Sequence, residues 1–222
     1  MTYVFQFGIV FDHIDRMLLG AWLTIRLSAM ALVLGLMVAV ICAYLRTAGP
    51  RPVRWLIAAY VELFRNTPFL VQLYIVFFAL PQAGIRFDAN EAALAAMVVN
   101  FGAYATEIVR AGVQSVPVGQ IETGLALGLK RLHIYRLIVL FPAIKAVFPA
   151  LASQFILLLL GSSVVSAISA NELTAISNTL QSTTFRAFEV YIVATLMYLG
   201  IAVAFRGLFA VAYWFVFVRG RE

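Results

Sequence analysis

The residues best placed to do chemistry in this chain are polar side chains within long apolar stretches. Asn100, Tyr104 and Glu107 follow one another at spacings of four and three, so they share one face of a helix. Polar groups are costly inside a membrane unless they face a cavity or another helix. These residues therefore indicate the binding of a polar solute, or hydrogen bonding between helices, rather than bond breaking.

Two acid–base pairs lie on the same stretches. Glu62 and Arg65 are three residues apart, as are Glu107 and Arg110, and this spacing places each pair on one helix face. We expect both to be structural ion pairs that neutralise their charges.

Pro68 lies near the middle of one apolar stretch and frees a backbone carbonyl about one turn earlier. A freed carbonyl is tolerated in a membrane only where neighbouring helices or a water-lined cavity satisfy it. Pro68 is therefore either a harmless kink or part of a solute path. The expected solute-path residues are Thr67, Pro68, Gln72, Asn100, Tyr104, Ser162 and Ser163. For the two serines, packing between helices is the alternative.

Bond-breaking motifs are missing from the sequence. It contains no phosphate-binding GxxxxGK[ST] loop, no HExxH, no GxSxG and no cysteine cluster. We expect this chain to be a transport protein and not an enzyme, with no metal site and no cofactor of its own. Energy for active transport would come from a partner or from an ion gradient.

Composition places the chain in a membrane. It is 64% hydrophobic and 12% charged, whereas an average soluble domain has about 25% charged residues. A spanning helix needs about 20 apolar residues, so 222 residues leave no room for a separate soluble domain. We predict a single all-α membrane domain over residues 1–222. The five expected spans cover residues 17–44, 55–80, 91–111, 144–169 and 187–218.

Basic residues predict the orientation, because loops rich in Arg and Lys stay on the cytoplasmic side. One side of the membrane carries only three of them, Arg16, Arg86 and Arg186, and nearby acidic residues offset their charge. The second side carries many: Arg46, Arg51, Arg54, Lys130, Arg131, Arg136, Arg219 and Arg221, with Arg110 and Lys145 at its edge. We therefore expect the N-terminus outside and the C-terminus in the cytoplasm.

A short helix is expected in the loop between the third and fourth spans. Residues 120–127 can form two turns, with Ser115 as a cap and Pro117 at the first helical position. Gly128 can end the helix in the left-handed conformation. Ile121 and Leu125 share a face, and the small Gly124 would let another backbone approach. These features indicate a docking element on a cytoplasmic surface.

This segment also carries a family resemblance. Glu-Thr-Gly at 122–124, with Gly128 four residues later and prolines at 142 and 149, resembles the loop signature of membrane subunits of ATP-binding-cassette (ABC) importers, Glu-Ala-Ala followed by Gly. More narrowly, YVELFRNTPFLVQ at 60–72, AYATEIVR at 103–110 and NELT at 171–174 resemble motifs of the polar amino-acid permease group. That group handles histidine, arginine, glutamine, glutamate and similar solutes.

The resemblance implies a type I ABC importer permease fold in the bacterial inner membrane. Two such subunits would form the translocation pathway, two ATPase subunits would bind ATP and Mg²⁺ below it, and an extracytoplasmic binding protein would deliver the amino acid. The short helix would be the coupling helix, within a coupling loop over about residues 113–143. The expected coupling residues are Gln120, Ile121, Glu122, Thr123, Gly124, Leu125 and Gly128.

The sequence departs from the family pattern at several positions. Thr123 and Gly124 replace the two alanines, and Leu160 and Gly161 stand where relatives usually carry Lys and Asp. A partner that keeps those charges would compensate, so we expect a heterodimer rather than a homodimer. The predicted function is the permease subunit of an ATP-driven importer for polar amino acids. The alternative is a self-sufficient amino-acid channel or secondary transporter.

Overall fold

The computed structural model describes residues 3–219, and every regular element among them is a helix. Arg221, one of the basic residues counted above, lies outside this range. The elements labelled η are short π-helical or 3₁₀ turns. In chain order the elements are α1 (Gly8–Phe11), α2 (Ile14–Ala48), α3 (Arg51–Arg65), α4 (Phe69–Tyr74), η1 (Ile75–Ala79), η2 (Leu80–Ala83), α5 (Ala89–Gln114), α6 (Val118–Ala126), α7 (Arg131–Ile134), η3 (Tyr135–Val139), α8 (Leu140–Gly161), η4 (Ser162–Ile168), α9 (Leu173–Thr184) and α10 (Ala187–Phe217).

Four helical segments are long and apolar enough to cross a membrane: α2, α5, the stretch from α7 to η4, and α10. A fifth crossing is formed if α3 is counted together with the segment from α4 to η2. These two parts meet at an angle of 110°. Five spans were predicted, but the second is sharply broken rather than kinked, and the fourth begins about 12 residues earlier than expected, at residue 132.

The core of the molecule lies where α2, α5 and α8 pack together. Small residues allow the close approach: a Cβ at Gly35 of α2 would lie 2.7 Å from Cδ1 of Phe101 on α5. Gly112 of α5 has the same role, because a Cβ there would overlap Val147 of α8. Large apolar side chains such as Phe101 and Phe155 fill the space between the helices and are fully buried. Alternating small and large residues in this way gives dense packing without strain.

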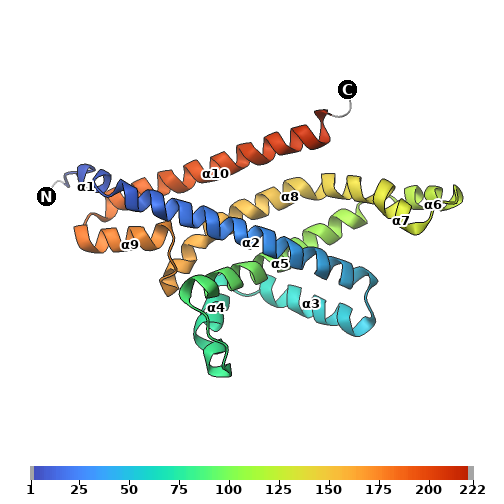
Figure 1. Ribbon diagram of the computed structural model, residues 1–222, viewed down its shortest axis with the longest axis horizontal. Helices are drawn as coiled ribbons and strands as arrows, with labels where there is room; N and C mark the ends of the chain where they lie inside the picture. Colours follow the sequence, from blue (N-terminus) through green and yellow to red (C-terminus); the bar gives the residue numbers. More distant parts are fainter. Residues whose placement is uncertain (1–2, 220–222) are drawn as a thin grey trace.

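The short elements gather at the two ends of the long helices (Figure 1). α1 and α9 lie at the end where the chain begins, beside the first turns of α2 and α10. α6, α7 and the loop between α2 and α3 lie at the opposite end, toward which α10 also runs. α4 projects sideways from the bundle, as the bend at the end of α3 requires.

The expected short helix is present as α6, but its caps differ from the prediction. α6 starts at Val118, so Pro117 occupies the N-cap rather than the first helical position. Ser115 ends α5, where its hydroxyl donates to the Gly112 carbonyl at 2.8 Å. Gly128 has a φ of +74°, as predicted for the residue that ends the helix. Leu129 N–H donates to Gly124 O at 3.0 Å, so the chain turns back tightly after α6.

Candidate solute path and its helix break

The second span is broken because Pro68 cannot donate a backbone hydrogen bond. α3 ends at Arg65 and α4 starts at Phe69. The last carbonyls of α3 therefore have no partner within their own helix. A membrane offers few other donors, so each such carbonyl needs one from nearby protein.

Side chains reach these carbonyls, although Glu62 O also accepts from the backbone N–H of Asn66 at 3.1 Å. Asn66 Nδ2 donates to Glu62 O at 2.9 Å, and Thr67 Oγ1 donates to Leu63 O at 2.7 Å. Tyr104 of α5 extends its hydroxyl to Arg65 O at 3.2 Å. These donors come from two segments, the linker between α3 and α4 and helix α5.

The remaining carbonyl, Phe64 O, is the acceptor that a residue other than proline at position 68 would bond. Gln72 of α4 supplies the missing donor, because its Nε2 lies 2.9 Å from Phe64 O. The same nitrogen lies 3.0 Å from Thr67 O and 2.9 Å from Thr67 Oγ1. Gln72 Oε1 in turn accepts from Asn100 Nδ2 at 2.9 Å. Gln72 is only 5% exposed, so its side chain is part of the packed interior.

Asn100 and Tyr104 also border a hollow beside the break. Its volume is about 230 Å³, and α4, α5 and α8 all contribute to it. Gln154 of α8 adds a third polar group that the sequence analysis missed, since an isolated Gln in an apolar helix carries no motif. The lining residues are Phe69, Met97, Asn100, Tyr104, Gln154, Leu157, Leu158 and Gly161. All of them are uncharged.

The two serines do not line this hollow. Ser162 is fully buried, and its hydroxyl donates to Leu159 O at 2.7 Å, within its own chain segment. Ser163 makes the equivalent bond to Leu160 O at 2.8 Å. Both hydroxyls bond to the preceding turn and neither serine borders this hollow, so their place on the solute path stays a prediction. η4 is a 3₁₀ turn, and its tighter winding brings each hydroxyl over the carbonyl three residues earlier.

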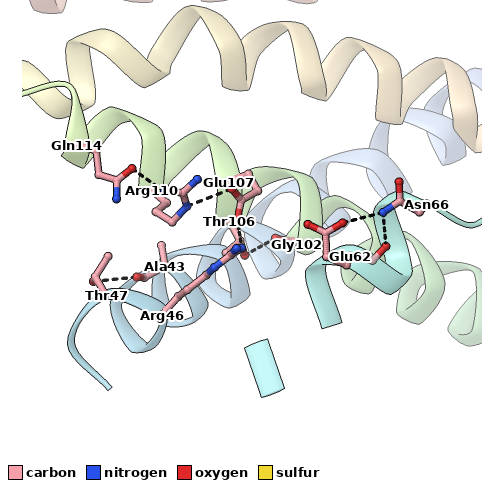
Figure 2. A network of polar contacts seen from close by, with 10 residues as sticks. All are labelled: Ala43, Arg46, Thr47, Glu62, Asn66, Gly102, Thr106, Glu107, Arg110 and Gln114. Atoms are coloured by element: carbon pink, nitrogen blue, oxygen red, sulfur yellow. Dashed lines mark hydrogen bonds and ion pairs between the residues drawn. The ribbon is translucent and has the colours of Figure 1, made fainter. Parts of the chain in front are cut away.

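Only one of the two predicted ion pairs forms. Glu107 accepts from Arg110 at 2.7 Å, and Arg46 of α2 approaches the same carboxylate (Figure 2). Glu62 pairs instead with Asn66 Nδ2, at 2.8 Å. Arg65 lies over the Tyr104 ring, 5.6 Å from its centroid. The Glu62–Arg65 prediction fails because the helix ends at Arg65 and the arginine is drawn to the aromatic face on α5.

Glu172 forms a second polar centre, at the start of α9. Its side chain is fully buried, and its carboxylate accepts from Ala175 N at 2.6 Å and from the Tyr198 hydroxyl at 2.5 Å. Thr24 of α2 accepts from Leu173 N at 3.1 Å. The helix N-terminus is thus capped by groups from two elements. Burial raises the pKa of the Glu172 carboxyl. Glu172 belongs to the NELT motif at residues 171–174, but the sequence gave no role for this residue.

α6 is held against the chain itself. Gly124 is buried, and a Cβ there would lie 2.9 Å from Cδ1 of Ile138 and 3.0 Å from Cγ1 of Ile134. Gly124 therefore packs against its own chain, and its contact with an ATPase subunit stays a prediction. Glu122 and Thr123 are exposed, and Leu125 is 50% exposed. Of the remaining expected coupling residues, Gln120 and Gly128 are exposed and Ile121 is half-buried.

Fold and hollow together define a helical membrane protein with a polar opening beside a broken span. The family described as "Binding-protein-dependent transport system inner membrane component" matches residues 7–214. The chain belongs to this family, which confirms the resemblance to membrane subunits of ABC importers.

Individual relatives agree with this assignment. The probable glutamine ABC transporter permease protein GlnM of Bacillus subtilis (strain 168) is 34% identical over 192 residues, covering 86% of this chain and 89% of that protein. The L-cystine transport system permease protein TcyB of the same organism is 37% identical over 154 residues, 69% of this chain and 66% of that protein. A crystal structure of an amino acid ABC transporter with histidines superposes with a TM-score of 0.89 at 31% identity, covering 95% of this chain and 99% of that one. The expected type I importer permease fold is confirmed.

Proposed function

We propose that this chain is the permease subunit of an ATP-driven importer for polar amino acids, and that it forms half of the translocation pathway. The relatives support the solute class, because those named above are permeases for glutamine and cystine. Since these two amino acids differ in shape and polarity, the solute of this chain is proposed only as a class.

The observation that carries the proposal is the hollow bordered by Asn100, Tyr104 and Gln154. Amide and hydroxyl groups can hydrogen-bond to a polar solute, and the surrounding apolar side chains raise the penalty for leaving them unpaired. The volume of about 230 Å³ lies below the roughly 300 Å³ at which ligand pockets usually begin. Half of a site, completed by a second subunit, accounts for this small size.

The second subunit is proposed to be a different permease. An amino acid carries two opposite charges, whereas the residues that line this hollow are all uncharged. Leu160 and Gly161 stand where the family resemblance leads us to expect Lys and Asp. A heterodimer would restore the charges from the partner's side of the pathway. An extracytoplasmic binding protein would deliver the solute to the pair.

ATPase subunits are proposed to dock at α6. The exposed side chains of Val118, Leu125 and Leu127 give this end of the molecule an apolar surface, with Glu122 exposed beside them. ATP and Mg²⁺ would be bound by those partners. Arg46 at the end of α2, Arg51 and Arg54 at the start of α3, and Lys130 before α7 support a cytoplasmic location for this end of a bacterial inner-membrane protein, with the N-terminus outside.

Amino-acid uptake by the assembled transporter tests the proposal. The chain is expressed with an ATPase subunit, a second permease and a binding protein, and uptake of a panel of labelled polar amino acids is measured. Asn100→Ala and Tyr104→Phe should each reduce uptake about tenfold or more, a change of about 1.4 kcal/mol in transition-state stabilisation. Gln82→Ala, at an exposed position of η2 whose side chain makes no hydrogen bond among the described residues, is the control and should retain uptake.

Three results would contradict parts of this proposal. Normal uptake by both variants would remove the hollow from the solute path. Uptake without any ATPase subunit would favour a self-sufficient channel or secondary transporter. Uptake by this chain and the ATPase without a second permease would overturn the heterodimer.

A further inference from the structure

We propose that Gln72 is a positioning residue of the solute path: its amide replaces the backbone donor that Pro68 lacks and ties the helix break to Asn100. This inference rests on the proposed function only for the role of the hollow. The geometry of the break itself is independent of what the hollow binds.

The first step is the identity of the acceptor. In an unbroken helix the N–H of residue 68 would donate to Phe64 O. Proline has no such N–H, and Gln72 Nε2 lies 2.9 Å from that oxygen. A side chain one turn beyond the proline thus takes over the bond that the proline removes.

The second step is the number of bonds. An amide nitrogen has two hydrogens, and three acceptors lie within reach of Gln72 Nε2: Phe64 O, Thr67 O and Thr67 Oγ1. Phe64 O lies on α3, before Asn66, and the two Thr67 acceptors lie in the linker after it. A single buried side chain therefore fixes the angle between α3 and α4.

The third step links the break to the hollow. Asn100 borders the hollow and donates to Gln72 Oε1 at 2.9 Å. Tyr104 also borders the hollow, and its hydroxyl reaches Arg65 O at 3.2 Å. A solute that draws the Asn100 amide or the Tyr104 hydroxyl into the hollow would compete with the bonds that hold the break. Occupancy of the hollow and the angle of the second span are therefore coupled through these two residues.

The angle can be measured by spin-label distances. Leu56 on α3 and Phe78 on η1 are 70% and 58% exposed, so cysteines at these positions accept labels without disturbing the core. Cys42, the only cysteine of the chain, is first replaced by Ala. Labelled chains are diluted among unlabelled copies in the complete transporter, so that only distances within one chain are read. Uptake and thermal stability are measured in parallel.

Gln72→Met removes the amide at nearly constant size. We expect a longer and broader Leu56–Phe78 distance distribution, because α3 and α4 lose their shared side chain, and uptake reduced about tenfold. Gln82→Met is the matched control, since Gln82 is exposed, lies in the same broken span and makes no hydrogen bond among the described residues. It should keep the original distribution and uptake.

A second variant separates positioning from simple stability. Pro68→Ala combined with Gln72→Met restores a backbone donor for Phe64 O and allows a continuous helix. We expect the thermal stability of the chain to return. The Leu56–Phe78 distance distribution should become narrow and centred on a longer distance, while uptake stays low. An unchanged distribution in Gln72→Met, or restored uptake in the double variant, would overturn the inference. If Gln72→Met opens the break but Asn100→Ala and Tyr104→Phe transport normally, the proposed solute path fails and the role of Gln72 at the break stands.

Discussion

The end of α3 and the start of α9 solve the same problem with opposite chemistry. Both are helix termini inside the protein whose backbone groups lack partners in their own helix. At the end of α3 the unpaired groups are carbonyls, and neutral donors from Gln72 and Tyr104 reach them. At the start of α9 they are N–H groups, and the Glu172 carboxylate and the Thr24 hydroxyl accept from them.

The surroundings of the two termini differ in the same way. Glu172 and Thr24 are fully buried, whereas Tyr104 and Asn100 are half-buried and face the hollow. A buried carboxylate is costly to leave without its hydrogen bonds, so the α9 terminus favours a single arrangement. A neutral amide or hydroxyl beside a hollow can exchange its partner for water or solute at much smaller cost. The comparison thus separates a static junction from one that can change.

The largest effect should come from Glu172→Ala. It removes the cap of α9, takes away one of the two hydrogen-bond partners of the half-buried Tyr198 hydroxyl and opens a cavity. We expect the free energy of unfolding to fall by about 3 kcal/mol. Unfolding in mixed micelles with increasing SDS measures the loss. Glu122→Ala, at an exposed position of α6, is the control and should be nearly neutral; a similar loss in both variants would refute a specific role for Glu172.

A smaller effect should appear as a change in pH dependence. Because burial raises the pKa of the Glu172 carboxyl, the folded chain binds more protons than the unfolded chain between the ordinary carboxyl pKa and the raised one. Stability contributed by this group is therefore lost as the pH rises through that window. Glu172→Gln keeps the shape without the charge and should remove this dependence. The difference between the two unfolding curves across pH isolates it, and parallel curves would contradict the assignment.

Thr67→Val tests the end of α3, where uncharged side chains satisfy the carbonyls, with a smaller expected loss of stability. It removes the bond to Leu63 O and one acceptor of Gln72, and we expect a loss of about 1 kcal/mol. Thr195→Val is the matched control, because Thr195 on α10 makes the same bond to the carbonyl four residues earlier but holds no other side chain. It should change stability by less than about 0.5 kcal/mol. Equal losses would mean that the local bond alone matters.

The smallest effect is expected for Ser162→Ala. Its hydroxyl bonds only to Leu159 O, and that carbonyl already accepts from the backbone N–H of Ser162. Stability should change by less than about 0.5 kcal/mol, and uptake should stay normal. A strong transport defect in Ser162→Ala would indicate that Ser162 belongs to the solute path, so that the path would extend beyond the hollow at the end of α3.

Local features of the fold were predictable from the sequence. Hydrophobic length predicts the spans, and Pro68 predicts a freed carbonyl one turn earlier, which is Phe64 O. Gly128 predicts the left-handed end of α6. The spacing of Asn100 and Tyr104 predicts their common face, and both border the hollow. In each case the deciding interaction lies within about two turns of the residue.

The missed features depend on segments far apart in the chain. Arg46 meets Glu107 across 61 residues, and Tyr198 meets Glu172 across 26. Such pairs follow from the packing of α2, α5, α9 and α10, which periodicity does not specify. The inward packing of Gly124 on α6 could not be predicted for the same reason. A helix of nine residues offers two apolar faces, and only the fold-back after Gly128 decides that Gly124 packs inward.

The close packing of Gly124 against Ile134 and Ile138 has a consequence for how α6 can move. Ile134 and Ile138 leave no clearance above this residue, so α6 has no freedom to slide or rock without carrying them along. Both isoleucines belong to a helical segment that runs from α7 through η3 to the end of α8, about 45 Å at 1.5 Å per residue, with a π-helical turn at Tyr135–Val139 and Pro149 inside α8. Gly161, at the far end of that segment, borders the hollow. One continuous helical segment thus has one end packed against α6 and the other end beside the hollow, so a displacement of α6 would also displace this segment.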